Sequence, residues 1–89
     1  MIFTIAEARD ILRIDGTDND TLILPLVEAI PPYLYESTGY QPKEGEDFSP
    51  IAKVVGRFLL HQWYYGEESD VQKVDRVLHS LLMRLSAES

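Results

Sequence analysis

The chain has 89 residues, of which 45% are hydrophobic, and it contains no cysteine. This length fits one small domain with one core, and the apolar content is too high for a disordered chain. The lack of cysteine excludes disulfides, thiolate zinc sites and a cysteine nucleophile.

The net charge of −7 is unevenly distributed along the chain. Residues 1–49 hold ten acids and three bases, whereas residues 50–89 hold five of each. Binding to phosphate depends on clustered Lys and Arg, so an acidic chain is not expected to seek nucleic acid. No apolar run approaches the roughly 20 residues of a membrane span, and the opening MIFTIAEARD lacks the basic region of a signal peptide. We therefore expect a soluble intracellular protein without a membrane segment.

The first predicted helix covers residues 5–14. Thr4 and Glu7 have the spacing of a capping box, in which hydroxyl and carboxylate each accept from a free N–H of the first turn. Apolar residues including Leu12 then follow at helical spacing. The pair Asp15-Gly16 is expected to end the helix.

The second predicted helix covers residues 19–38 and is followed by Gly39, a typical residue just beyond a helix end. Its apolar residues recur at spacings of three and four. Pro25, Pro31 and Pro32 lie inside it, and an internal proline costs about 3 kcal/mol or more because it removes a backbone donor. We expect a kink or a break at Pro31-Pro32 that leaves two shorter pieces.

The third predicted helix follows a polar loop at residues 40–49. Ser49 is its expected N-cap, and Pro50 takes the first helical position, where the missing N–H costs nothing. The helix is expected to reach Tyr65, with Gly66 as its stop.

The fourth predicted helix begins with a second capping box, formed by Ser69 and Gln72, and its apolar residues continue to Leu85. No alternating, strand-like pattern appears in the sequence. The prediction is an all-α fold of four helices that form one domain over residues 1–89. The expected core anchors are Leu12, Leu26, Ile30, Phe58, Leu59, Trp63, Leu78 and Leu81.

The stretch HQWYYGEES at residues 61–69 contains three consecutive aromatic residues. Trp63 is in register with Phe58 and Leu59, which favours a core position. Stacking on nucleobases would need a groove lined by Lys and Arg, and few basic residues lie near this stretch. Consecutive helical residues point about 100° apart, so at least one of Tyr64 and Tyr65 should be exposed or lie in an interface.

Other candidate sites are poorly supported by their spacing. His61 and His79 are the only histidines, and neither has a second histidine four residues further on, so no metal signature results. Asp15, Asp18 and Asp20 suggest a calcium loop, but the twelfth position counted from Asp15 is a leucine. No nucleophile motif or phosphate loop is present. We expect no cofactor, no metal and no enzymatic activity.

Several segments of the sequence occur in a recognisable order. They are IFTIAEA at 2–8, ILRID at 11–15, an acidic turn at 18–20 followed by a helix that opens with LI at 22–23, YLYESTG at 33–39, LHQWYYGE at 60–67 and LL at 81–82. Their order and spacing resemble the bacteriophage head–tail connector proteins, also called head-completion adaptors, over nearly the whole chain. The internal prolines depart from the family, in which the second helix is usually uninterrupted.

The resemblance implies a structural role in the virion, with assembly in the host cytoplasm. Roughly twelve copies would form a ring beneath the portal protein, continue the DNA channel and dock the next connector or tail protein. DNA would pass without sequence-specific binding, because acidic side chains repel its phosphates. Candidate channel-facing acids are Asp18, Asp20, Glu44, Glu46 and Asp47, and candidate subunit contacts are Tyr33, Tyr64 and Tyr65.

Two other functions stay open at this point. One is a small helical adaptor that binds a single protein partner through a helix groove. The other is a helix-turn-helix DNA-binding protein, against which the net charge argues.

Overall fold

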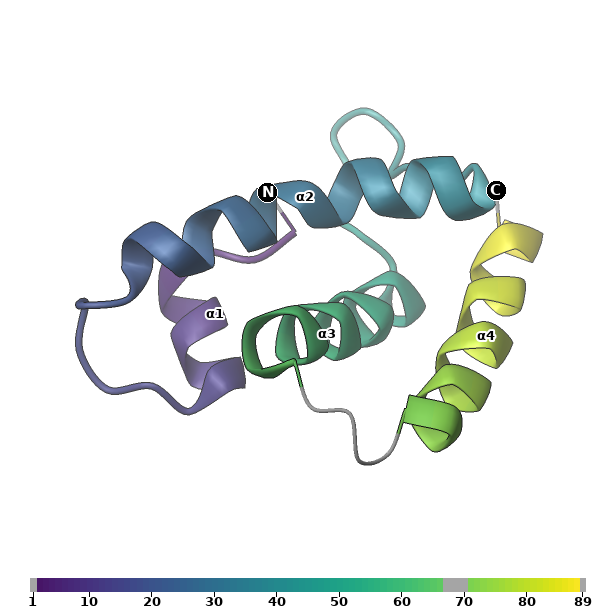
Figure 1. Cartoon of the computed structure of the whole chain (residues 1–89). Helices are drawn as coiled ribbons and strands as arrows, with labels where there is room; N and C mark the ends of the chain where they lie inside the picture. The colour runs from purple at the N-terminus through teal and green to yellow at the C-terminus, as the bar shows by residue number, and fades with distance from the viewer. Residues whose placement is uncertain (1, 67–70, 89) are drawn as a thin grey trace.

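The computed structural model describes residues 2–66 and 71–88, with side chains described from residue 76 onward in the second range. These ranges contain α1 (Ile5–Leu12), α2 (Asp20–Thr38), α3 (Pro50–Tyr65) and α4 (Val71–Glu88), and no strand. Figure 1 shows α2 along the top, α3 beneath it, α1 on the left and α4 on the right. The all-α prediction is confirmed. Within the described ranges no helix is long and apolar enough to cross a membrane.

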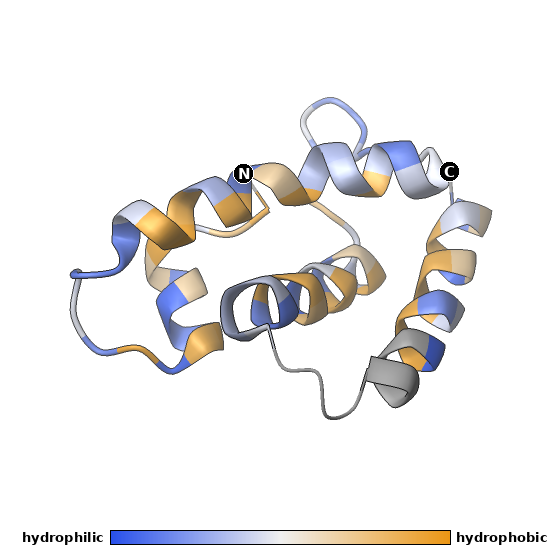
Figure 2. Ribbon diagram, in the orientation of Figure 1, coloured by the Kyte–Doolittle hydropathy of each residue, from blue (hydrophilic) through white to orange (hydrophobic). Residues whose placement is uncertain are grey.

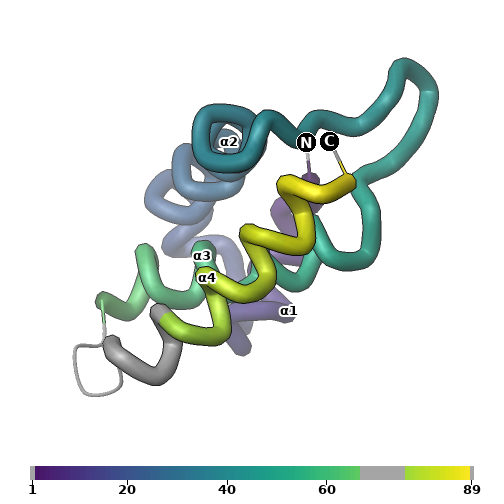
Figure 3. Tube along the Cα trace, turned by 90° about the vertical axis from the view of Figure 1, so that its right-hand side faces the viewer, coloured from purple at the N-terminus to yellow at the C-terminus, as the bar shows by residue number. Residues whose placement is uncertain are grey.

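The centre of the fold is the pair α2 and α3, since each of them contacts both of the other helices. Figure 3, turned by 90°, shows α4 in front of α3 with α2 above them. No polar or charged side chain is buried among the described residues. Figure 2 shows apolar segments on the helices, whereas the upper part of the loop that joins α2 to α3 is hydrophilic to neutral. The buried core consists of Ile2, Phe3, Ala8, Leu12, Ile23, Val27, Ile30, Leu34, Tyr40, Ala52, Val55, Leu59, Leu60 and Leu85.

The predicted capping box starts α1. The N–H of Glu7 donates to Thr4 Oγ1 at 3.1 Å, and the N–H of Thr4 donates to Glu7 Oε1 at 2.9 Å. The second of these bonds holds the pKa of Glu7 below its usual value, because it stabilises the charged carboxylate. The helix ends at Leu12, two residues earlier than predicted, because Arg13 takes a left-handed conformation with φ 57°.

Replacing Thr4 by alanine is expected to destabilise the fold by about 1 kcal/mol, because the first turn loses its side-chain acceptor. Urea unfolding of the purified variant measures this loss. Thr17→Ala is a suitable control, since Thr17 is exposed and precedes α2. Equal stability of the two variants would contradict a role for the capping box.

Helix α2 is continuous from Asp20 to Thr38 with all three prolines inside it. The expected division into two shorter pieces is therefore wrong, whereas a bend at Pro31-Pro32 stays a prediction. Pro25 and Pro32 are exposed, so solvent can satisfy carbonyls that lose their N–H donor. The helix ends as predicted, with Gly39 in the left-handed conformation at φ 78°.

Helix α3 begins and ends as the sequence predicts. Ser49 Oγ accepts from the N–H of Ala52 at 3.2 Å, and Gly66 ends the helix with φ 59°. The same Ser49 hydroxyl donates to Glu88 Oε2 at 2.9 Å, which ties the end of α4 to the start of α3. The hydroxyl of the buried Tyr40 accepts from the N–H of Ser49 at 2.8 Å. This bond joins the two ends of the loop at residues 40–49. The predicted capping box at Ser69 and Gln72 lies outside the described residues and side chains.

The expected core anchors differ in burial. Leu12, Ile30 and Leu59 are buried, whereas Leu26, Trp63, Leu78 and Leu81 are partly buried and pack against the core. Phe58 is half-buried and lies outside that cluster. The reason is helical geometry: Phe58 points about 100° away from Leu59, whose side faces the core.

Candidate functional site

The candidate channel-facing acids fall into two groups that do not meet. Asp18 and Asp20 lie at the α1–α2 turn on the left of Figure 1, whereas the loop that carries Glu44, Glu46 and Asp47 is at the top. Asp18, Glu44 and Glu46 are exposed. Each of the other two acids has a basic partner, so its charge is partly offset.

Two ion pairs account for the offset acids. Asp20 Oδ1 accepts from Arg9 Nε at 3.0 Å and Oδ2 from Arg9 Nη2 at 3.3 Å, in a half-buried bridge between α1 and α2. Asp47 Oδ2 accepts from Lys53 Nζ at 2.8 Å. The hydrogen bond from Lys53 lowers the pKa of Asp47 and raises the pKa of Lys53. The partners are 11 and 6 residues apart in the sequence, and neither spacing is one that a helix would bring together by itself.

The lowered pKa of Asp47 predicts how the free energy of unfolding changes with pH. Its contribution is fully present above the unfolded-state pKa, near 3.8, and is lost as pH falls through the lower folded-state pKa. Asp47→Asn should therefore make the free energy of unfolding fall less steeply below that pH. Urea unfolding across a pH series checks this, with Glu44→Gln on the same loop as the control. An unchanged slope in Asp47→Asn would contradict the pairing.

The candidate contact tyrosines have different environments. Tyr33 is half-buried and packs edge-on against Trp63, with ring centroids 5.5 Å apart. Tyr64 is also half-buried and meets the ring of Tyr65 at 5.0 Å. Tyr65 is 43% exposed, and its hydroxyl donates to the carbonyl of Leu12 at 2.5 Å. The expectation that at least one of Tyr64 and Tyr65 is exposed is confirmed, and it is Tyr65.

Helix α3 has a second apolar side that sequence reasoning missed. We call the residues Ile51, Val54, Phe58, His61 and Tyr65 the α3 outer face. Val54 and Tyr65 are 40% and 43% exposed, His61 is exposed, and Ile51 and Phe58 are half-buried. The ring of His61 lies 4.7 Å from that of Tyr65. The spacings of three, four, three and four residues are typical of a helix that packs against another helix, and this signal was readable from the sequence.

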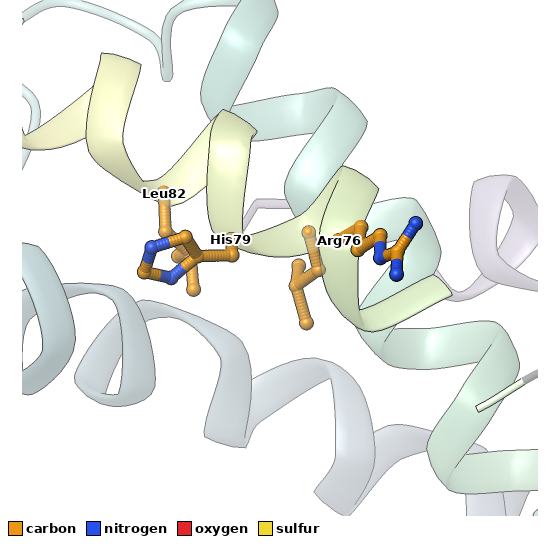
Figure 4. Close-up of a pocket in the computed structure, with 4 residues that line it drawn as sticks. Arg76, His79 and Leu82 are labelled. Atoms are coloured by element: carbon orange, nitrogen blue, oxygen red, sulfur yellow. The ribbon is translucent and has the colours of Figure 1, made fainter. Parts of the chain in front are cut away.

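A pocket of about 450 Å³ lies beside α4 and is lined by Arg76, Leu78, His79 and Leu82. Figure 4 shows three of these residues labelled on α4, with another helix running across the lower part of the view. The lining combines a guanidinium and an imidazole with two leucines. No group of three metal-binding side chains occurs among the residues that the structure describes. The two leucines of the pocket offer an apolar surface to a bound group.

Comparisons with known proteins add no identification to these surfaces. The chain matches no family model, no curated protein and no solved structure.

Proposed function

We propose that the protein is a structural subunit of a phage head–tail connector and has no enzymatic activity. The ordered set of segments from residue 2 to residue 82 carries this proposal, because it extends over nearly the whole chain. Several of these segments lie at helix boundaries, which gives their spacing a physical meaning. The segment at 2–8 contains the capping box of α1, the segment at 33–39 ends at Gly39, and the segment at 60–67 contains Gly66, which ends α3.

In this role roughly twelve copies form a ring below the portal protein and continue its channel. The ring offers its far side to the next connector or tail protein. The exposed acids Asp18, Glu44 and Glu46 support passage of DNA, since negative side chains repel the phosphate backbone. The two unpaired acids of the loop are better candidates for the channel wall than Asp20 and Asp47, whose charges are offset by Arg9 and Lys53.

Electron microscopy of the protein, alone and mixed with the portal protein of the same phage, tests this proposal. The expected result is a ring of the protein, either free or attached to the portal. A protein that stays monomeric and never associates with portal at any concentration would contradict it. Assembly only in the presence of portal would still agree with it.

A helical adaptor that binds one protein partner is the second candidate. The pocket beside α4 favours it, because Leu78 and Leu82 offer an apolar surface for a partner side chain. Native mass spectrometry separates the two functions, since an adaptor predicts a complex with a single copy of a host protein. Salt-dependent retention on DNA would instead indicate the helix-turn-helix alternative.

A further inference from the structure

The exposed side of α2 is acidic and partly apolar. We call Leu24, Glu28, Pro32, Tyr35 and Glu36 the α2 outer face; all five are exposed, and Leu24 and Tyr35 are 36% and 54% exposed. They recur at the spacings that place residues on one side of a helix. The sequence of α2 contains no Lys, Arg or His. A partner of this face therefore meets large apolar side chains and the two carboxylates of Glu28 and Glu36, with no basic side chain from α2.

The charged side chains of α3 are basic, whereas the five residues of the α3 outer face itself carry no formal charge at pH 7. The sequence of α3 contains Lys53, Arg57 and His61 but no Asp or Glu. Arg57 is exposed beside Val54 and His61, and it makes no ion pair with any residue in the described ranges. Lys53 is already paired with Asp47. Arg57 is thus the cation of α3 without an ion pair in the described ranges, and it lies next to the exposed apolar side chain of Val54.

The two faces point in opposite directions in one molecule. Helices α2 and α3 pack together through their buried sides, which include Val27 and Ile30 of α2 and Val55 and Leu59 of α3. Their outer faces are therefore turned away from each other and cannot meet within the same chain. They can meet between two copies, in a head-to-tail contact that leaves one free face of each kind at the ends.

We infer that the α2 outer face of one copy packs against the α3 outer face of the next copy. A second copy is the occupant because this same chain carries both the acidic and the basic member of the pair, on helices of 19 and 16 residues. Apolar contacts supply affinity, and the opposite charges fix which faces meet. The closure of such contacts into a ring rests on the proposed function, whereas the pairing of the faces does not. Tyr65 is then the contact tyrosine, and Tyr33 and Tyr64 belong mainly to the fold.

Charge reversal on each face tests the pairing. One variant combines Arg57→Glu with His61→Glu, and the other combines Glu28→Lys with Glu36→Lys. All four positions are exposed, and circular dichroism checks that the helices are retained. Sedimentation velocity of the wild type at low salt should show association that increases with concentration, and each variant alone should need at least about ten times more protein to associate.

Mixing the two variants provides the sharper result. In an alternating assembly every contact joins an acidic to a basic face, so the mixture should associate as strongly as the wild type. A control variant with Glu44→Lys and Glu46→Lys makes the same change of net charge as the α2 variant, but on the loop and away from both faces, and it should not show the loss. A mixture that stays dissociated, or a control that loses association equally, would overturn the inference.

Portal binding separates this inference from the proposed function. A wild type that stays monomeric at low salt but binds portal would overturn the pairing and leave the connector function standing. A wild type that associates through these faces but never binds portal would support the pairing and contradict the connector function.

Discussion

Replacing Leu60 by alanine is expected to destabilise the protein by about 2–5 kcal/mol, because the substitution leaves a cavity in a packed core. Leu60 is 0% exposed and lies on α3, which like α2 contacts each of the other three helices. A small domain has a total free energy of unfolding of about 5–15 kcal/mol. Urea unfolding measures the loss, which is a substantial fraction of that total.

Two matched substitutions on the same helix complete this test. Val54 is 40% exposed, so Val54→Ala should change the free energy of unfolding by about 0.5 kcal/mol or less. Trp63 is half-buried at the edge of the core, so Trp63→Ala should cost less than the about 3–5 kcal/mol of a fully buried tryptophan. A variant of Val54 as unstable as that of Leu60 would contradict the assignment of the two sides of α3.

Replacing Gly56 by leucine is expected to destabilise the protein by about 3 kcal/mol or more through overpacking and lost burial. A Cβ at this position would lie 2.9 Å from Ile2 Cδ1 and 3.1 Å from Phe3 Cε2, so the N-terminal residues pack directly on the backbone of α3. A leucine side chain must displace Ile2 and Phe3, which are 2% and 4% exposed.

Gly56→Ala is the control for this prediction. Its single methyl meets only the ends of side chains, and alanine favours a helix over glycine by about 1 kcal/mol. The unfavourable close contact of the methyl and the favourable helix propensity of alanine should nearly cancel, so the free energy of unfolding should change little. Urea unfolding compares the variants, and NMR spectra report whether Ile2 and Phe3 have moved. Full stability of Gly56→Leu would contradict the close packing of residues 2 and 3 on α3.

The helix boundaries that sequence predicted correctly depend on local chemistry. A threonine three residues before a glutamate, a proline after a serine, and glycines at positions 39 and 66 each act through the backbone of their own turn. The end of α1 was missed because Arg13, a residue that rarely adopts positive φ, takes the left-handed conformation. The continuity of α2 was missed because tertiary packing can stabilise a helix that its prolines disfavour.

The surfaces were harder to predict than the core. Helix α3 has two apolar sides, and a single apolar stripe read from its sequence mixed Phe58 of the outer face with Leu59 of the core. The pairing of Asp20 with Arg9 depends on how α1 packs against α2, which spacing along the chain does not determine. The opposite charges of α2 and α3 were readable, but their meaning depends on the two helices packing back to back.

Sedimentation of the portal ring encoded in the same genome with increasing amounts of this protein tests the proposed connector function most directly. A connector subunit is expected to shift the portal boundary to a larger particle and to saturate at one subunit of this protein for each portal subunit. A portal boundary that stays unchanged up to the highest concentration, with the protein sedimenting separately as a monomer, would contradict the proposed function.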